Sequence, residues 1–352
     1  MDKDLLRQME QKLDSGDNTE EVLRDMINHV RANNVQKEAD TSLEEMIDDF
    51  LESAEKANQK FKFVKQIYYE LRTKDELDYD SSYLHVKKNY LDVFSDFDNL
   101  AINKILSGIT NDHFRTAILS CAINYSDLDR VVICEDVSNV RYFGDRLGDG
   151  GYKKRVIVEG SVGSSCGVEM SNGEIYVKGD AGFLCGSAMS GGKITVTGST
   201  TYLCGCEMTG GEIQINGNAG SSCGSGMSNG KIIVYGDVLD CCGSRMSGGE
   251  IYVKGSTGHS CGEEMSGGEI HIDKSTDSFC GSRMSGGEIY IKEDAKEFCG
   301  SCMSNGIIDV GGNVGEYCGC DMKNGEIYVD GNIQEIRKAK KRGKIFNKGK
   351  VY

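Results

Sequence analysis

Cysteine is the residue whose number and spacing first suggest chemistry in this chain of 352 residues. Fifteen cysteines are present, and nine of them recur at an interval of nineteen residues. These nine are Cys166, Cys185, Cys204, Cys223, Cys242, Cys261, Cys280, Cys299 and Cys318. Cysteine can act as a nucleophile, a metal ligand or a disulfide partner, but an equal spacing over nine units is typical of a structural repeat.

Three further cysteines, Cys206, Cys302 and Cys320, lie two or three residues after a repeat cysteine. A zinc or iron–sulfur site needs about four ligands that converge on one point. Such convergence is not expected here, because each repeat cysteine is predicted to point inward and its neighbour to lie at the turn. Cys302 and Cys320 are one unit apart and keep a metal or redox alternative open. We assign no catalytic residue, no bound metal and no cofactor.

Two catalytic patterns are explained by the repeat. The segment Gly226–Gly230 matches the G-x-S-x-G nucleophile elbow, but its serine recurs in seven of the nine units, as a turn residue would. Of the five histidines, only His259 and His271 lie in the repeats, and neither has an acidic partner that the sequence makes evident. A hydrolase triad is therefore not expected.

The repeat unit reads C-G-x-x-M-[STK]-[NG]-G-x-I-x-[VI]-x-G. In the first unit Ile175 and Val177 are two residues apart and share one face of a strand, while Tyr176 lies on the other. One short strand per nineteen residues can stack parallel on itself, with glycine turning each coil. We predict a right-handed parallel β-helix of nine coils over residues 151–333, with a core of Cys, Met, Ile and Val too narrow to hold a ligand.

The outward strand position carries mixed aromatic and polar residues, which suit a protein interface better than an active site. The candidate interface residues there are Tyr176, Tyr252, His271, Tyr290 and Tyr328. At one corner Lys274 and Glu293 replace a frequent glycine. This corner has two interpretations: a turn relaxed by drift, or a charged docking corner.

Three glutamates, Glu250, Glu269 and Glu288, are expected to stack on consecutive coils. They should repel one another unless Lys254 and Lys292 neutralise them. Asp273 is expected to lie between those two lysines. The row is either a solvated charge ladder or an acidic patch for a basic partner or for the basic tail of this chain.

Before the repeats the hydrophobic period is helical, and we predict an acidic α-helical domain over residues 1–124. Thr41 and Ser42 start capping boxes for a long helix through Leu43–Ala54. Shorter helices are expected at 5–13, 20–32, 83–94, 100–106 and 113–123. Residues 125–150 should connect the helical domain to the β-helix or cap it, with strands at 131–134 and 140–143. Residues 334–352 are predicted to form a basic C-terminal tail. The helical part is interpreted as a cap over the open strand edge rather than an effector domain.

The composition narrows the class of protein. The formal net charge of −15 disfavours nonspecific binding to nucleic acid or an anionic membrane. No apolar stretch approaches the length of a bilayer span, and the acidic start is unlike a signal peptide. We expect a cytoplasmic protein whose cysteines are thiols.

The segment of residues 179–198, GDAGFLCGSAMSGGKITVTG, resembles a known family. It is similar to the glycine-repeat (GXGXG) β-helix that the large subunit of glutamate synthase, in its C-terminal domain, shares with the β-helical subunit of formylmethanofuran dehydrogenase. The resemblance implies a structural and interaction element whose catalytic chemistry lies in other modules.

These observations predict a non-catalytic scaffold that binds protein partners. The alternative is an accessory subunit of an oxidoreductase or amidotransferase complex, as in the two proteins that the repeat resembles. The partners would then be oxidoreductase subunits or further copies of the chain, and neither nucleic acid nor a membrane is expected.

Overall fold

The structure is a computed structural model, and the residues that it describes lie within the unit Lys56–Tyr352. It describes residues 153–335 and 343–352 without a break, most of 113–148, Gly151, and scattered positions between 56 and 105. The helices expected at 5–13, 20–32, 43–54 and 83–94 lie outside the described residues, as does most of the domain predicted over 1–124. The expected helix at 113–123 is confirmed as α6 (His113–Tyr125).

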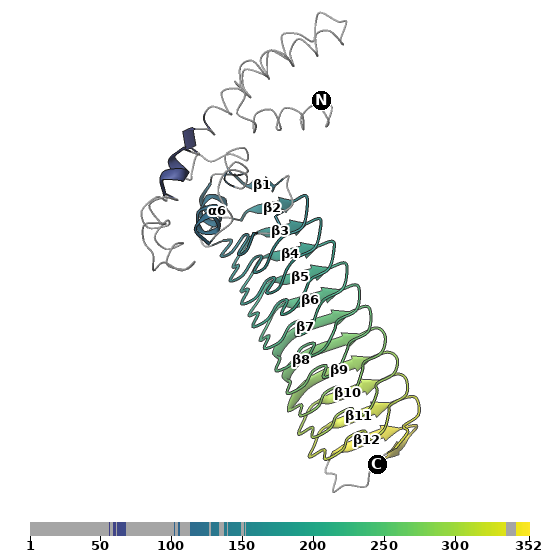
Figure 1. Ribbon diagram of the computed structural model, residues 1–352. Coiled ribbons are helices and arrows are strands. Elements are labelled where there is room, and N and C mark those ends of the chain that lie inside the picture. The colour runs from purple at the N-terminus through teal and green to yellow at the C-terminus, as the bar shows by residue number, and fades with distance from the viewer. Residues whose placement is uncertain are drawn as a thin grey trace, which may run out of the picture. The chain divides into compact units, whose positions relative to one another are not determined.

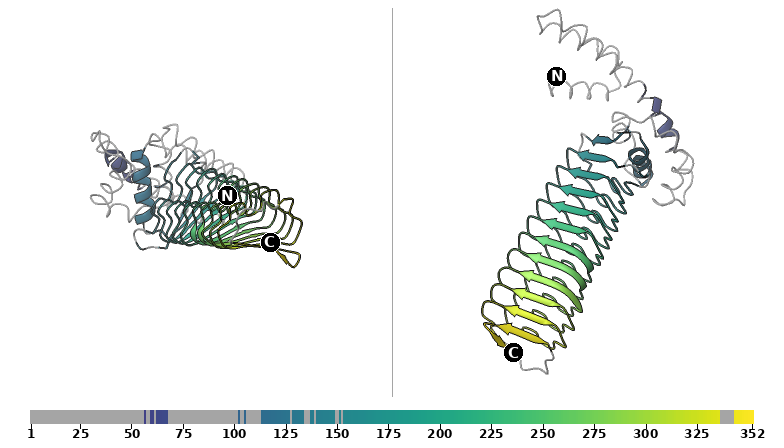
Figure 2. Two further views of the ribbon diagram at one scale, coloured as in Figure 1. Left: turned by 90° about the horizontal axis from the view of Figure 1, so that it is seen from below. Right: turned by 180° about the vertical axis from the view of Figure 1, so that it is seen from behind.

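The strands of the described chain form one sheet in sequence order. Figures 1 and 2 show them stacked one above another along one wall of the coils. Every neighbouring pair is parallel except the last, β12–β13, which is antiparallel. The strands are β1 (Arg130–Ile133), β2 (Arg155–Val158), β3 (Glu174–Val177), β4 (Lys193–Val196), β5 (Glu212–Ile215), β6 (Lys231–Val234), β7 (Ser247–Val253), β8 (Ser266–Ile272), β9 (Gly286–Ile291), β10 (Ile307–Val310), β11 (Glu326–Val329), β12 (Lys344–Asn347) and β13 (Lys350–Val351).

From β2 to β11 the four-residue strand cores pair at the nineteen-residue interval, so that equal positions lie side by side. Ile194, for example, pairs with Ile175 on one side and Ile213 on the other. The repeated Cys, Met, Ile and Val or Ile side chains are all buried. The predicted parallel β-helix is therefore confirmed, and each coil contributes the same four apolar side chains to one continuous core.

A fifth inward row lies four residues before each repeat cysteine, where the sequence pattern is not constant. Parallel backbone bridges join this position from coil to coil, and its side chains are small, mostly Val, Ala and Thr. Where the row carries threonine, the hydroxyl groups need partners. Thr257 Oγ1 donates to Thr276 Oγ1 at 2.9 Å, which satisfies one buried hydroxyl with another.

Glycine is required at two points of the coil for two different reasons. Gly224, directly after its cysteine, has a φ of +68°, and a Cβ atom there would lie 2.4 Å from Ile251 Cδ1 of the next coil. Gly230, directly before its strand, has a φ of +96°, and a Cβ there would meet Met208 Cε and backbone of the preceding coil. Both turns depend on positive φ and on close approach between coils.

The stack begins one coil earlier than the cysteine repeat suggests, at β1. The expected strand at 140–143 is wrong, because Val140 to Phe143 lie in turns and Tyr142 has a φ of 55°. Phe143 occupies the cysteine position of this first coil, and its carbonyl accepts from Gly167 N at 2.9 Å. Leu147 likewise occupies the methionine position and accepts from Ser171 N at 3.0 Å. This first coil is longer than the others and carries larger side chains at the two positions. The pattern Cys-Gly-x-x-Met therefore does not identify it in the sequence.

The other end of the stack uses part of the basic segment 334–352. β12 continues the parallel sheet, pairing Ile345 with Ile327, and the Ile345 side chain is fully buried. β13 then turns back antiparallel, with Tyr352 N donating to Ile345 O at 2.9 Å. This short hairpin pairs the backbone of β12 on the side away from β11.

Helix α6 is held against the first coils by polar contacts. Ser120 Oγ donates to Tyr142 O, and Asn124 Nδ2 donates to Asp145 O, both at 3.2 Å. The buried Lys154 ammonium donates to Ser126 O and to Leu128 O just beyond the helix. A cation at this end of a helix satisfies carbonyl groups that have no intrahelical partner.

We predict that Cys223→Ala lowers the free energy of unfolding by about 1–2 kcal/mol, because it leaves a small cavity in a fully packed core. Cys223→Ser should cost as much or more, because it buries a hydroxyl group. Urea denaturation followed by circular dichroism measures both. Cys206→Ala, at a half-buried site, is the matched control and should change stability by less than about 0.5 kcal/mol. A Cys223→Ala protein as stable as this control would contradict the packing role.

We further predict that Lys154→Met loosens α6, because the carbonyl groups of Ser126 and Leu128 lose their buried donor. The expected cost is roughly 2–3 kcal/mol. Hydrogen exchange of the amides at 118–126 measures it as faster local opening. Lys153→Met is the control, since the Lys153 side chain is 71% exposed. Equal exchange rates in the two variants would show that Lys154 does not hold the helix.

Candidate functional site

The outward side of the sheet carries two rows of side chains, from the first and the third residue of each four-residue strand core. The third-residue row contains the predicted interface residues Tyr176, Tyr252, His271, Tyr290 and Tyr328. All of them are exposed or half-buried. The structure therefore brings them onto one wall of the coils, as expected.

The first-residue row alternates in charge over the six coils from β2 to β7. It runs Arg155, Glu174, Lys193, Glu212, Lys231 and Glu250. Three ion pairs result: Arg155–Glu174 at 2.8 Å, Lys193–Glu212 at 2.8 Å and Lys231–Glu250 at 3.3 Å. The hydrogen bond from Arg155 lowers the pKa of the Glu174 carboxyl. This row was not predicted, although alternating signs at nineteen-residue spacing are visible in the sequence.

The alternation ends at Glu250, which is followed in register by Glu269 and Glu288. Lys254 and Lys292, the lysines that could have neutralised these glutamates, are not their ion-pair partners. Both lysines instead pair with Asp273, at 2.9 and 2.6 Å, which confirms the predicted place of Asp273 between them.

The three glutamates find other partners. Glu250 pairs with Lys231 of the coil before, Glu269 Oε2 lies 3.1 Å from His271 Nε2, and Glu288 accepts a hydrogen bond from Tyr290. This hydrogen bond raises the pKa of Tyr290 to about 12. One formal cation, Lys231, thus faces three carboxylates, which leaves a local excess of negative charge.

Beside the glutamates, three rings stack on one another. The His271 ring lies 4.6 Å from Tyr252 and 4.8 Å from Tyr290, with interplanar angles of 3° and 11°. The Lys231 ammonium lies 4.4 Å from the centre of the Tyr252 ring. We name these three rings, together with Glu250, Glu269 and Glu288, the acidic–aromatic strip. Stacking holds the rings in fixed orientations, so the strip is a preorganised flat surface.

Both repeat histidines have acidic neighbours, which corrects the sequence-based expectation. His259 Nδ1 lies 3.4 Å from Asp277 Oδ1, and His271 lies beside Glu269. In the described part of the chain, however, no hydrogen bond joins either imidazole to a serine. Ser228 of the apparent nucleophile elbow lies at a turn, where its backbone N donates to Met208 O at 2.9 Å. The geometry therefore assembles no triad among these residues.

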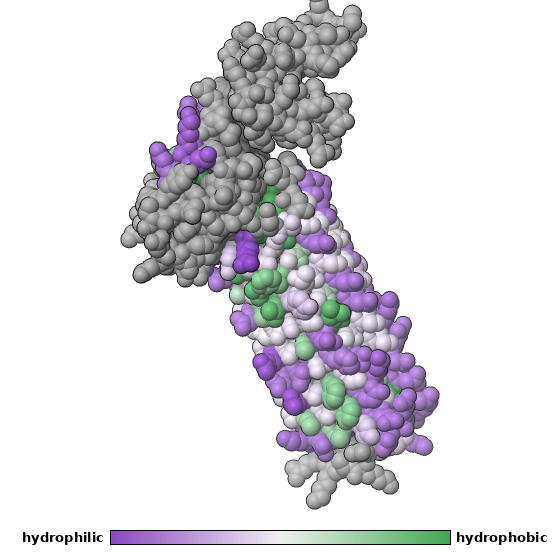
Figure 3. All heavy atoms as spheres, in the orientation of Figure 1, coloured by the Kyte–Doolittle hydropathy of each residue, from purple (hydrophilic) through white to green (hydrophobic). Residues whose placement is uncertain are grey.

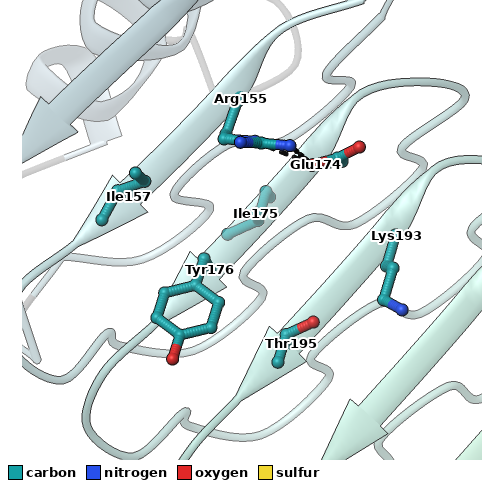
Figure 4. A pocket seen from close by; sticks show the side chains of 7 residues that line it. All are labelled: Arg155, Ile157, Glu174, Ile175, Tyr176, Lys193 and Thr195. Carbon is teal, nitrogen blue, oxygen red and sulfur yellow. Dashed lines mark hydrogen bonds and ion pairs between the residues drawn. The ribbon is translucent and has the colours of Figure 1, made fainter.

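Two shallow depressions lie on or beside the outer sheet face. The first, of about 260 Å³, is shown in Figure 4, where Arg155 and Glu174 point toward one another and Tyr176 and Thr195 lie on neighbouring strands. The second, of about 440 Å³, lies over glycine turns and is bordered by Glu288 and Glu326. Their polar side chains lie at the surface, and the charges of the first are in ion pairs. These depressions suit contact with a partner surface better than enclosure of a small substrate.

The nine repeat cysteines lie in the core and form a ladder of neighbouring thiols. Hydrogen bonding with Cys204, together with burial, raises the pKa of the Cys223 thiol well above its usual range. Such thiols are poor nucleophiles. Outside the ladder, Cys302 is exposed, and Cys206 and Cys320 are half-buried. Nowhere among the described residues do three or more His, Cys, Asp or Glu side chains gather as a metal site would require.

The corner with Lys274 and Glu293 is tied by polar contacts. Glu293 N donates to Lys274 O at 3.3 Å, and Glu293 Oε2 accepts from Ser275 Oγ at 3.1 Å. Lys296 Nζ pairs with Asp277 at 2.8 Å nearby. The carboxylate of Glu293 is thus hydrogen-bonded within the corner, while both interpretations of it, drift and docking, remain predictions.

Within the described part of the chain, exposed apolar side chains occur only in small groups. Figure 3 shows a mostly purple and white surface on the coils, with separate green areas. The exposed members include Phe183, Tyr202, Tyr235, Leu239 and Phe279. No described helix is long and apolar enough to cross a lipid bilayer.

Comparison with known proteins gives two kinds of result. No curated protein matches the sequence. Among solved structures, a similar chain occurs in the X-ray crystal structure of the formyltransferase/hydrolase complex from Methylorubrum extorquens in complex with methylofuran. That chain is 26% identical over 53% of this chain and 59% of its own length, with a TM-score of 0.34. The match thus spans little more than half of either chain.

A family model named for the GXGXG motif matches residues 119–302. The match starts inside α6, ahead of the first cysteine repeat, and includes the coil that begins at β1. It covers more than half of the 352 residues. This chain belongs to the GXGXG motif family.

Proposed function

We propose that the protein is a non-catalytic scaffold that binds a protein partner through its outer sheet face. The observation that carries this proposal is the acidic–aromatic strip, where stacked rings and an excess of carboxylates are held in register on a flat wall. Aromatic side chains supply contact area without losing much conformational entropy on binding, because stacking has already fixed them.

The charge of the strip favours one kind of partner. Glu250, Glu269 and Glu288 follow one another without an intervening cation in their row. Farther along the sheet, burial and the neighbouring Asp330 raise the pKa of Asp309, as expected where acidic groups accumulate. A partner segment rich in Lys or Arg would neutralise the glutamates and could place its cations over the tyrosine rings.

The packing of the core supports the same proposal. From Cys166 onward its inward rows are filled by Cys, Met, Ile, Val and small residues, nearly all of them buried. A close-packed core of this kind leaves no chamber for a substrate or a prosthetic group. The alternative of an accessory subunit in an oxidoreductase or amidotransferase complex uses the same surface and differs only in the identity of the partner.

Site-directed photo-crosslinking in the cell that makes the protein tests the proposal. We predict that a photoreactive side chain at Tyr252 gives one dominant adduct with another protein. The same group at Tyr202, which is 60% exposed but lies away from the strands, should not. Equal adducts from both positions, or none from Tyr252, would contradict the proposal. Adducts with a second copy of the chain would show that the partner is another copy of the same protein.

Charge reversal tests the chemistry of the partner. We predict that Glu269→Lys with Glu288→Lys lowers the adduct yield at Tyr252 about tenfold or more, because like charges then face a basic segment. Glu207→Lys, at an exposed site outside the strands, is the matched control and should leave the yield unchanged. A yield that rises after the double reversal would show that the partner is acidic.

A last prediction concerns catalysis. Since the inward rows are apolar and closely packed, the purified chain should carry no stoichiometric visible chromophore. Absorbance spectroscopy of protein isolated from its native source checks this. Stoichiometric flavin, haem or cluster absorbance that remains with the folded chain would overturn the non-catalytic assignment.

A further inference from the structure

In each coil, two residues follow the Cys-Gly pair before the inward methionine. The second of them has a positive φ, as Cys302 (58°) and Asp321 (55°) illustrate. A backbone hydrogen bond joins this second residue to the first residue of the next coil, for example from Glu264 N to Ser282 O at 2.9 Å. Side chains at the two positions also approach across coils in the opposite order, since Glu263 Oε1 at a first position lies 3.1 Å from Arg283 Nη1 at the second position of the next coil.

Cys302 and Cys320 occupy these two positions on neighbouring coils. Cys302 N donates to Cys320 O at 2.7 Å, so their backbones are directly joined. Cys302 Sγ lies 3.8 Å from Ser301 Oγ, and Cys320 Sγ lies 3.7 Å from Asp321 Oδ2. Neighbouring coils are spaced by about 4.8 Å. Because Cys320 is offset by one residue from the equivalent of Cys302, their Cα atoms should lie about 5–6 Å apart, within the roughly 4.4–6.8 Å that a disulfide spans.

No other pair of accessible thiols adjoins in the described part of the chain. Cys206 and Cys241 are the two remaining half-buried cysteines, and the rest of those described, Cys302 and Cys320 aside, are buried. The hydrogen-bonded neighbour of Cys206 in the coil before is Ala188, and that of Cys241 in the coil after is His259. Cys206 and Cys241 thus serve as single-thiol comparisons within the same molecule.

We propose that Cys302 and Cys320 are a redox modification site that closes to a disulfide between the two coils. The oxidant is a low-molecular-weight disulfide such as oxidised glutathione. The more exposed Cys302 thiolate attacks it, which forms a mixed disulfide and releases one glutathione thiol. The Cys320 thiolate then attacks Cys302 Sγ, which forms the Sγ–Sγ bond and releases the second glutathione. Two cysteine thiols are oxidised, one glutathione disulfide is reduced, and the two cysteine protons end on the released thiols.

The consequence is a covalent tie between the last two cysteine coils, which carry β10 and β11. The buried ladder cannot replace this pair, because an apolar interior excludes the oxidant and disfavours the thiolate. The chemistry is independent of whether the outer sheet face binds a partner.

Oxidation of the intact chain with oxidised glutathione tests the proposal. Remaining thiols are alkylated, and cleavage before aspartate then yields the separate peptides Asp294–Ile308 and Asp309–Cys320. We expect these two peptides to be linked in a single chain, with a loss of two titratable thiols, and reduction by dithiothreitol to reverse the link. Unlinked peptides that each carry glutathione, or a link between two chains, would overturn the proposal.

Three variants identify which cysteines form the disulfide. Cys302→Ser should abolish the link, while Cys320→Ser should leave a stable glutathione adduct on Cys302. Cys206→Ser is the matched control and should keep the link in full. A link that survives in Cys302→Ser would show oxidation of the ladder residues Cys299 and Cys318, which share the same two peptides, and would contradict the assignment.

Discussion

The structure depends on one constraint: each coil returns to the same place after nineteen residues, so every strand residue lies beside its own equivalents in the coils before and after. Backbone hydrogen bonds between coils enforce this register, and a slip of one residue would exchange the inward and outward faces of a strand. The inward rows can then be filled by repetition of one side chain. Cys, Met and Ile each stack on themselves from Cys166 onward, and these side chains are buried at each coil.

The same constraint governs the outer face, where repetition is costly for charges. Like charges stacked one coil apart repel, and the six coils from β2 to β7 avoid this by alternating from Arg155 to Glu250. The acidic–aromatic strip departs from this solution. Only Glu250 pairs with a cation of its own row, Lys231, whereas Glu269 and Glu288 contact His271 and Tyr290 of the neighbouring row. A surface that gives up ion pairing, yet fixes its rings by stacking, is better suited to a partner than to stability alone.

The sequence was sufficient to predict the fold because its strongest signal, the nineteen-residue interval, is also the physical repeat. The sequence was less informative where a coil keeps the same backbone geometry but carries other residue types at the repeat positions. Phe143 and Leu147 fill the cysteine and methionine positions of a longer coil, and the small inward row alternates among Val, Ala and Thr. The outward placement of the candidate interface residues follows from their position in the strand. The partners of Glu269 and Glu288 were not, because they depend on how side chains turn within a coil.

The register itself can be measured with two histidines and zinc. Histidines substituted at Thr195 and Gln214 face outward on adjacent coils, about 4.8 Å apart. Histidines at Thr195 and Ile233 are two coils apart, at roughly twice that distance. Zinc titration should show the adjacent pair binding about tenfold or more tightly than either single histidine, since two imidazoles can then share one ion. The separated pair should bind no more tightly than the single variants. An adjacent pair without this gain, or a separated pair that has it, would contradict the in-register stack.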